Sequence, residues 1–293
     1  MPYIFAMFRF AAMSLCVVML VGCSSPPQPV PTTPAPPPPP VANAQQLVRD
    51  VMRVMAERKH YEFVMRASSA TYQAPAEGNV TLNSVSPEHT TVIEGVTLAM
   101  RVRSSLTEHG EAQDFFYVSA DSNVFAKLPP GTPGSTAEWM KIPRVDSVDE
   151  IGNVYGAIMG LHDVTAQMVV PTHYLLPMLE AGGTVTATQE VPFLGQRAMH
   201  HMLDLDLAKA AGQLSNAYLR GEARRRYQAD PGAAWSTPKV ELVVSPGNEL
   251  LRLTLRAAMD KKSEFPMEIT FSKWGEPKVI TPPARAPEFP AGR

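Results

Sequence analysis

Three side chains able to bind a metal, His200, Asp204 and Asp206, lie on one short segment, "HHMLDLDL". In a strand they would share one face with Met202, because alternate residues point the same way. A histidine with two carboxylates is a known ligand set for zinc. Strand neighbours two residues apart lie about 7 Å from each other, however, so consecutive members cannot all reach one ion. We therefore expect a solvated strand face and no metal.

The other reactive side chains show no catalytic spacing. The sequence contains no G-x-S-x-G nucleophile elbow, no phosphate-binding P-loop and no H-E-x-x-H pair. His162, Asp163 and His173 flank two predicted helices, where roles in loops or helix caps are expected. The basic run 224–226 is expected to be a solvated helix surface, with contact to anionic lipid headgroups as the alternative. The sequence predicts neither an enzyme nor a cofactor.

The N-terminus predicts export. Residues 1–22 carry one cation and no acid, and their apolar run is short for a membrane span, which needs about 20 apolar residues. The run ends at Leu20-Val21-Gly22-Cys23, which resembles the lipobox of bacterial lipoproteins. In that family the thiol receives a diacylglyceryl group and the chain is cut before the cysteine. We expect a signal peptide over 1–22, starting at Met1 or Met7, and lipidation of Cys23. A plain signal peptide followed by a chance cysteine is the alternative.

Residues 23–41 are predicted to be a tether. Ten of the fifteen residues from Pro26 to Pro40 are proline, which favours polyproline II over helix or sheet. At about 3.1 Å per residue this stretch reaches roughly 45 Å. A ligand for an SH3-type domain is the alternative. With the acylated Cys23 at one end, the tether predicts a lipid anchor in the cell membrane, with the following domain on the extracytoplasmic face.

Charge and length define the domain after the tether. Removing residues 1–22 leaves 25 basic and 28 acidic residues, and a net charge near −3 gives no reason to expect nucleic acid as a partner. Residues 42–283 are long enough for one sizeable core. Residues 284–293 are proline-rich and predict a disordered tail.

The hydrophobic pattern of the domain predicts an α+β fold. An amphipathic helix opens it, with Leu47, Val51, Val54 and Met55 on one face. Strand-like segments follow, then two helices, then strands again, an order that places helices on one face of a curved antiparallel sheet. The predicted strands lie within 61–72, 78–85, 89–106, 111–128, 139–142, 183–207, 238–260 and 267–271, and the predicted helices within 147–164, 171–183 and 206–228.

Three stretches carry a family resemblance: "FLGQRAMHHMLDLDLAKA", "VELVVSPGNELLRLTL" and the closing "FSKWGEPKVITPP". With the lipobox, they resemble the LppX/LprG-like lipoproteins of actinobacteria, in the LolA-like half-barrel superfamily, over residues 45–283. The resemblance implies an eleven-stranded half-barrel with helices over its concave face. It also implies a cavity for the acyl chains of glycolipids or phospholipids, and a transport partner in the envelope. The segment 208–237 is longer and more basic than the family pattern.

The residues expected to line such a cavity follow from strand alternation and from the apolar middle helix. From the strands they are Val102, Phe116, Val118, Leu203, Leu205, Leu253, Leu255 and Ile269, and from the helical lid Leu175, Met178 and Leu179. Each methylene buried there contributes about 0.8 kcal/mol. We predict a lipid-anchored protein that binds or carries an amphiphilic lipid or glycolipid without covalent chemistry. A closed-core lipoprotein of the same fold, acting in protein interaction or assembly, is the alternative.

Overall fold

A computed structural model describes residues 43–67, 75–84, 95–104, 111–133, 135, 137–143, 153–229, 238–260 and 263–289. The predicted signal peptide, Cys23, the tether and residues 290–293 lie outside these ranges.

One eleven-stranded antiparallel sheet organises the domain. Its strand order is β6-β5-β4-β3-β2-β1-β11-β10-β9-β8-β7, so two meanders are joined where β1 pairs with β11. The strands are β1 (His60–Ala67), β2 (Ala76–Leu82), β3 (Val96–Ser104), β4 (Gln113–Ala120), β5 (Asn123–Lys127), β6 (Met140–Ile142), β7 (Gly183–Phe193), β8 (Gln196–Leu205), β9 (Lys239–Val244), β10 (Leu250–Asp260) and β11 (Ser263–Ser272). This arrangement confirms the predicted fold class.

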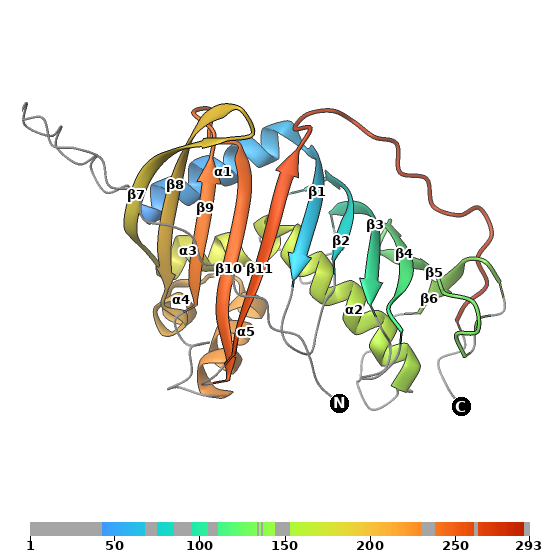
Figure 1. Ribbon diagram of the computed structural model, residues 1–293. Coiled ribbons are helices and arrows are strands. Elements are labelled where there is room, and N and C mark those ends of the chain that lie inside the picture. Colours follow the sequence, from blue (N-terminus) through green and yellow to red (C-terminus); the bar gives the residue numbers. More distant parts are fainter. Residues whose placement is uncertain are drawn as a thin grey trace, which may run out of the picture. The chain divides into compact units, whose positions relative to one another are not determined.

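The helices cover one face of the sheet, the concave one (Figure 1). They are α1 (Ala44–Arg58), α2 (Asn153–Val169), the short 3-10 helix η2 (Pro171–His173), α3 (Leu175–Gly182), α4 (Leu207–Gln213) and α5 (Ala217–Ala229). Asn43 caps α1, because its side-chain oxygen accepts hydrogen bonds from the backbone N–H groups of Gln45 and Gln46. The predicted apolar face of α1 is buried.

Rows of apolar side chains cross the concave face from strand to strand. Met65 of β1 pairs with Ile269 of β11, which pairs with Leu253 of β10 and through it with Leu242 of β9. Residues directly opposite on neighbouring strands point to the same face, so the register alone builds the row. These rows and the helices form one continuous core.

The C-terminal residues differ from the predicted disordered tail. The N–H of Lys141 in β6 donates to the carbonyl of Pro287, and the N–H of Phe289 donates to the carbonyl of Lys141. Phe289 is buried in the main core. The segment 287–289 therefore covers the outer edge of β6, and the tail prediction is wrong for the described residues up to 289.

Candidate functional site

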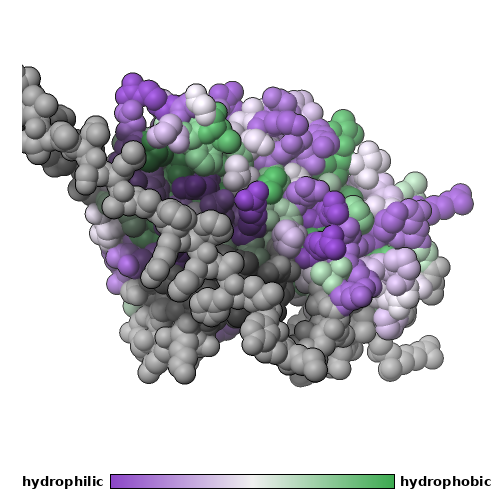
Figure 2. All heavy atoms as spheres, in the orientation of Figure 1, coloured by the Kyte–Doolittle hydropathy of each residue, from purple (hydrophilic) through white to green (hydrophobic). Residues whose placement is uncertain are grey.

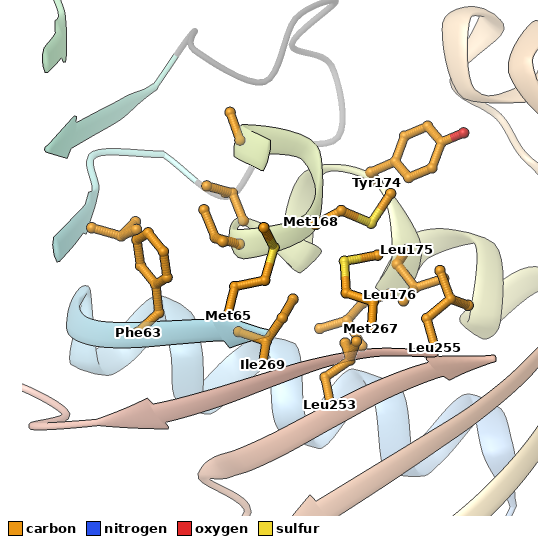
Figure 3. Close-up of a cluster of buried hydrophobic side chains, with 14 of the residues drawn as sticks. Phe63, Met65, Met168, Tyr174, Leu175, Leu176, Leu253, Leu255, Met267 and Ile269 are labelled. Carbon is orange, nitrogen blue, oxygen red and sulfur yellow. The ribbon is translucent and has the colours of Figure 1, made fainter. Parts of the chain in front are cut away.

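The helical layer meets the sheet through apolar side chains. Nine of the eleven residues predicted to line a cavity lie in the main core. Figure 3 shows Met65, Leu253 and Ile269 of the sheet pointing toward α3 and its flanking helices. The nine are Val102, Leu175, Met178, Leu179, Leu203, Leu205, Leu253, Leu255 and Ile269.

The apolar space left under α3 is small. A cavity of about 30 Å³ lies under α3, and it is lined by Met168, Tyr174, Leu175, Met178, Leu205, Leu207, Pro238 and Leu255. Ligand pockets usually measure about 300–1,000 Å³, and 30 Å³ is roughly the share of one water molecule. Side chains of the described residues thus fill the region where the sequence predicted room for acyl chains.

The predicted orientation of Phe116 and Val118 is wrong. The concave row through β4 contains Phe115, which pairs with Val102, and Tyr117, which pairs with Met100. Phe116 and Val118 therefore point to the convex face, where Phe116 is 38 % exposed. Alternation could not decide the register, because the run "FFYV" is apolar at every position.

Three polar links attach α2 to the concave face. The hydroxyl of Tyr117 donates to the carbonyl of Ile158 at 3.1 Å, and that of Tyr61 donates to the carbonyl of Val169 at 2.8 Å. Between them, Oγ of Ser119 lies 2.7 Å from Nε2 of His162. Buried hydrogen bonds of this kind fix the position of a helix that is otherwise held by non-directional apolar contacts.

Ser119, His162 and Asp163 form a hydrogen-bonded series that the sequence did not predict. Nδ1 of His162 lies 2.8 Å from a carboxylate oxygen of Asp163, so the order of atoms is that of a hydrolase triad. A nucleophile must also be reached by its substrate, and both Ser119 and His162 are 0 % exposed. In this arrangement the series joins α2 to β4.

Methionine is frequent in the interior. Among the described residues eight methionines are buried, including Met65 and Met267 of the sheet and Met168 and Met178 of the helical layer. Methionine is unbranched and has three rotatable bonds, so it adapts to irregular or changing surroundings. The contact between helices and sheet therefore has side chains suited to repacking around a guest.

The polar candidates from the sequence occupy separate places. His200 contacts Glu241 at 3.1 Å, whereas Asp206 caps α4 by accepting from the N–H of Lys209. Among the described residues, no group of three His, Cys, Asp or Glu side chains could hold a metal ion. His173 is buried in η2, and its Nδ1 lies 3.1 Å from Oγ1 of Thr172.

Two further features concern contact with a membrane: the basic run on α5 and the length and apolar character of the helices. In the basic run on α5, Arg225 is ion-paired with Glu222, Arg224 is exposed, and the side chain of residue 226 lies outside the described part. Within the residues that the structure describes, no helix combines the length and apolar character needed to cross a bilayer.

Comparisons with known proteins give likenesses of fold. No protein-family profile and no curated protein matches the sequence. Among solved structures, LprF from Mycobacterium bovis has a TM-score of 0.47 and 12 % identity, covering 83 % of this chain and 97 % of its own. The Mycobacterium tuberculosis lipoprotein LppX has a TM-score of 0.44 and 13 % identity, and the alignment covers 81 % of this chain and 98 % of LppX.

A third likeness is to the MucA/MucB complex of Pseudomonas aeruginosa, with a TM-score of 0.30 and 11 % identity, covering 78 % of this chain and 56 % of that one. LprF and LppX are lipoproteins of the kind that the sequence resembles. At such identities, function has to be argued from this chain's own residues.

Proposed function

We propose that this protein is a lipid-anchored protein of the cell envelope that binds the acyl chain of an amphiphile between α3 and the concave face of the sheet. The observation that carries the proposal is the wholly buried, apolar contact around the small cavity under α3, where Leu175 and Met178 meet Leu205 and Leu255. Lipidation of Cys23 and the proline-rich tether place this domain outside the membrane.

Energetics determine what kind of guest can open this contact. The lid side chains Leu175, Leu176, Met178 and Leu179 are all buried, and each contributes about 1.5–3 kcal/mol by staying out of water. Lifting α3 into water would therefore cost roughly 6–12 kcal/mol. An acyl chain of about 16 carbons contributes about 13 kcal/mol relative to water, at 0.8 kcal/mol per methylene, which is at least as large as this cost. Only a long apolar guest offsets the opening.

Native mass spectrometry tests the binding. The Cys23→Ser chain, purified without detergent after mixing with phospholipid vesicles, is expected to retain lipid masses. Met178→Trp should fill the space under α3 and abolish this retention. Met202→Trp, the same change at a side chain 40 % exposed on the opposite face of the sheet, should have no effect. Equal retention by both variants would contradict the proposed site.

The anchor is tested separately. The N-terminal peptide of the membrane-extracted wild-type protein should carry the mass of a diacylglyceryl group on Cys23. An unmodified cysteine would refute the anchor without affecting the binding site.

The closed-core alternative is supported by the volume of about 30 Å³, which is a tenth of the smallest usual ligand pocket, about 300 Å³. Under this second function the domain is an interaction or assembly module of the envelope. A clean protein mass after the vesicle experiment, with Met178→Trp less stable than the wild type because a closed core has no room for the larger side chain, would favour it.

A further inference from the structure

The convex face of the sheet carries a larger groove than the concave one. It crosses β1 to β4 and has a volume of about 560 Å³, within the usual range for ligand sites of about 300–1,000 Å³. Three strand spacings of about 4.8 Å make its length about 14 Å. The segment after β11 runs along the ends of these strands to β6 and borders the groove through Lys278 (Figure 1).

The groove combines apolar and aromatic surface with polar groups. Val64, Phe116, Val118 and Trp139 line it, and Val64 and Phe116 are among the exposed large apolar residues of the molecule. Figure 2 shows this side of the protein, where apolar residues lie scattered among hydrophilic ones. An aromatic ring beside polar groups suits a ligand that has one apolar and one hydrogen-bonding side.

Two polar atoms of groove residues lack partners. Nε of Arg101 and Oδ1 of Asn79 are shielded from solvent and have no hydrogen-bond partner among the described residues. A shielded donor or acceptor without a partner destabilises the protein, and a ligand that formed a hydrogen bond with it would remove that cost. One is a donor and the other an acceptor, so the ligand must supply both functions. Hydroxyl groups do so, since each donates once and accepts twice.

Ion pairs hold the polar side chains of the groove in place. The other nitrogens of Arg101 contact Asp114 at 2.8 Å and Glu77 at 3.4 Å, and the Asp114 carboxylate raises the pKa of Arg101. Glu62 pairs with Lys273 and Lys278. The hydrogen bond from Lys273 lowers the pKa of Glu62. These charges are matched within the groove, which leaves its central part close to neutral.

One end of the groove is cationic. A second hollow of about 220 Å³ shares Val64, Glu77 and Arg101 with the groove and adds Arg66 and Arg103. Neither Arg66 nor Arg103 forms an ion pair with a described residue, and both are exposed. Guanidinium groups bind carboxylate and phosphate with a planar, two-pronged geometry. This end therefore favours an anionic group on the ligand.

We propose that the convex groove binds an acidic oligosaccharide, with a sugar ring over Phe116 and its carboxylate or phosphate at Arg66 and Arg103. The surface of a flat bilayer cannot reach into a groove that is bordered by Trp139 and Lys278. A peptide cannot add to the sheet here, because the backbone groups of β1 to β4 are used in the ladders between them. This site is independent of the acyl-chain site on the other face.

Isothermal titration of the full Cys23→Ser chain tests the proposal with four probes: tetragalacturonate, maltotetraose, inorganic phosphate and hexaglutamate. Tetragalacturonate should bind at least about tenfold more tightly than the other three, a difference of roughly 1.4 kcal/mol. Phe116→Ala should weaken it about tenfold, as expected for an aromatic anchor. Leu194→Ala, at an exposed apolar residue of the β7–β8 turn, is the matched control and should change nothing.

The charged end has its own test. The double variant Arg66→Gln, Arg103→Gln should bind tetragalacturonate no better than maltotetraose. The four side chains altered in these variants are exposed, and melting curves check that each variant is folded. The proposal is overturned if tetragalacturonate does not bind, or if hexaglutamate or phosphate binds more tightly than tetragalacturonate. It is also overturned if the protein binds anionic phospholipid vesicles and Phe116→Ala abolishes that binding.

Discussion

The link between Ser119 and His162 makes a sharp prediction about stability. Ser119→Ala removes one partner of a hydrogen bond of 2.7 Å and leaves Nε2 of a fully buried imidazole without a partner. An orphaned buried polar group costs about 1–3 kcal/mol. Since 1 kcal/mol shifts the melting temperature of a 150–250-residue domain by about 2–4 °C, the expected fall in Tm is roughly 2–12 °C.

Urea denaturation and calorimetry of a double-mutant cycle measure this effect. Ser119→Ala and His162→Leu should each destabilise the protein. The double variant should be less destabilised than the sum, because replacing both partners by apolar groups leaves nothing unpaired. Ser272→Ala, at an exposed position, is the surface control. If Ser119→Ala changes the free energy of unfolding by less than about 0.5 kcal/mol, as an ordinary surface substitution does, α2 is not held by this link.

Three further outcomes are expected. Phe115→Ala should lower the free energy of unfolding, measured by urea denaturation, by about 3–5 kcal/mol, because Phe115 faces the core. Phe116→Ala should lower it by less than about 1 kcal/mol. Equal losses would contradict the register of β4. Burial raises the pKa of Tyr61 above its ordinary value of 10.0. The contribution of neutral Tyr61 to the free energy of unfolding is therefore complete below about pH 10. It falls by about 1.4 kcal/mol per pH unit as the pH rises towards the folded-state pKa. Tyr61→Phe should remove this slope from alkaline denaturation curves. Deleting residues 287–293 removes buried Phe289, should cost about 1.5–3 kcal/mol, and should speed amide exchange in β6; unchanged exchange would show that the edge is not covered.

The fold could be predicted where the sequence pattern was unambiguous. The hairpin of β9 and β10 alternates apolar and polar residues, and Leu253 and Leu255 face the core as predicted. At β4 both faces carry apolar residues, because the convex face holds a groove of its own, so alternation could not set the register. Phe289 was missed for a different reason. Its partner strand β6 is distant in sequence, and local composition predicted only a proline-rich tail.

The role of the predicted residues in binding stays a prediction. Nine of the eleven lie in the main core, but whether they enclose a large cavity depends on a shift of a few ångströms between α3 and the sheet. Ser119 could not be found at all, since a serine in a strand carries no signal of a histidine 43 residues later. Only the pairing of β4 with its neighbours and the placement of α2 bring the two side chains together.

The polar links also determine where an acyl chain can enter. Those to Ile158, His162 and Val169 lie along α2, whereas the small cavity lies under α3 and reaches α2 only at Met168 in its last turn. A chain entering beneath α2 would leave the hydroxyls of Tyr61, Tyr117 and Ser119 facing hydrocarbon, at about 1–3 kcal/mol each. A chain entering beneath α3 breaks none of these bonds. A covalent cross-link between α2 and β4 should therefore leave lipid uptake intact, and one between α3 and β10 should abolish it. The reverse result would place the entrance under α2 and remove the role assigned to α3.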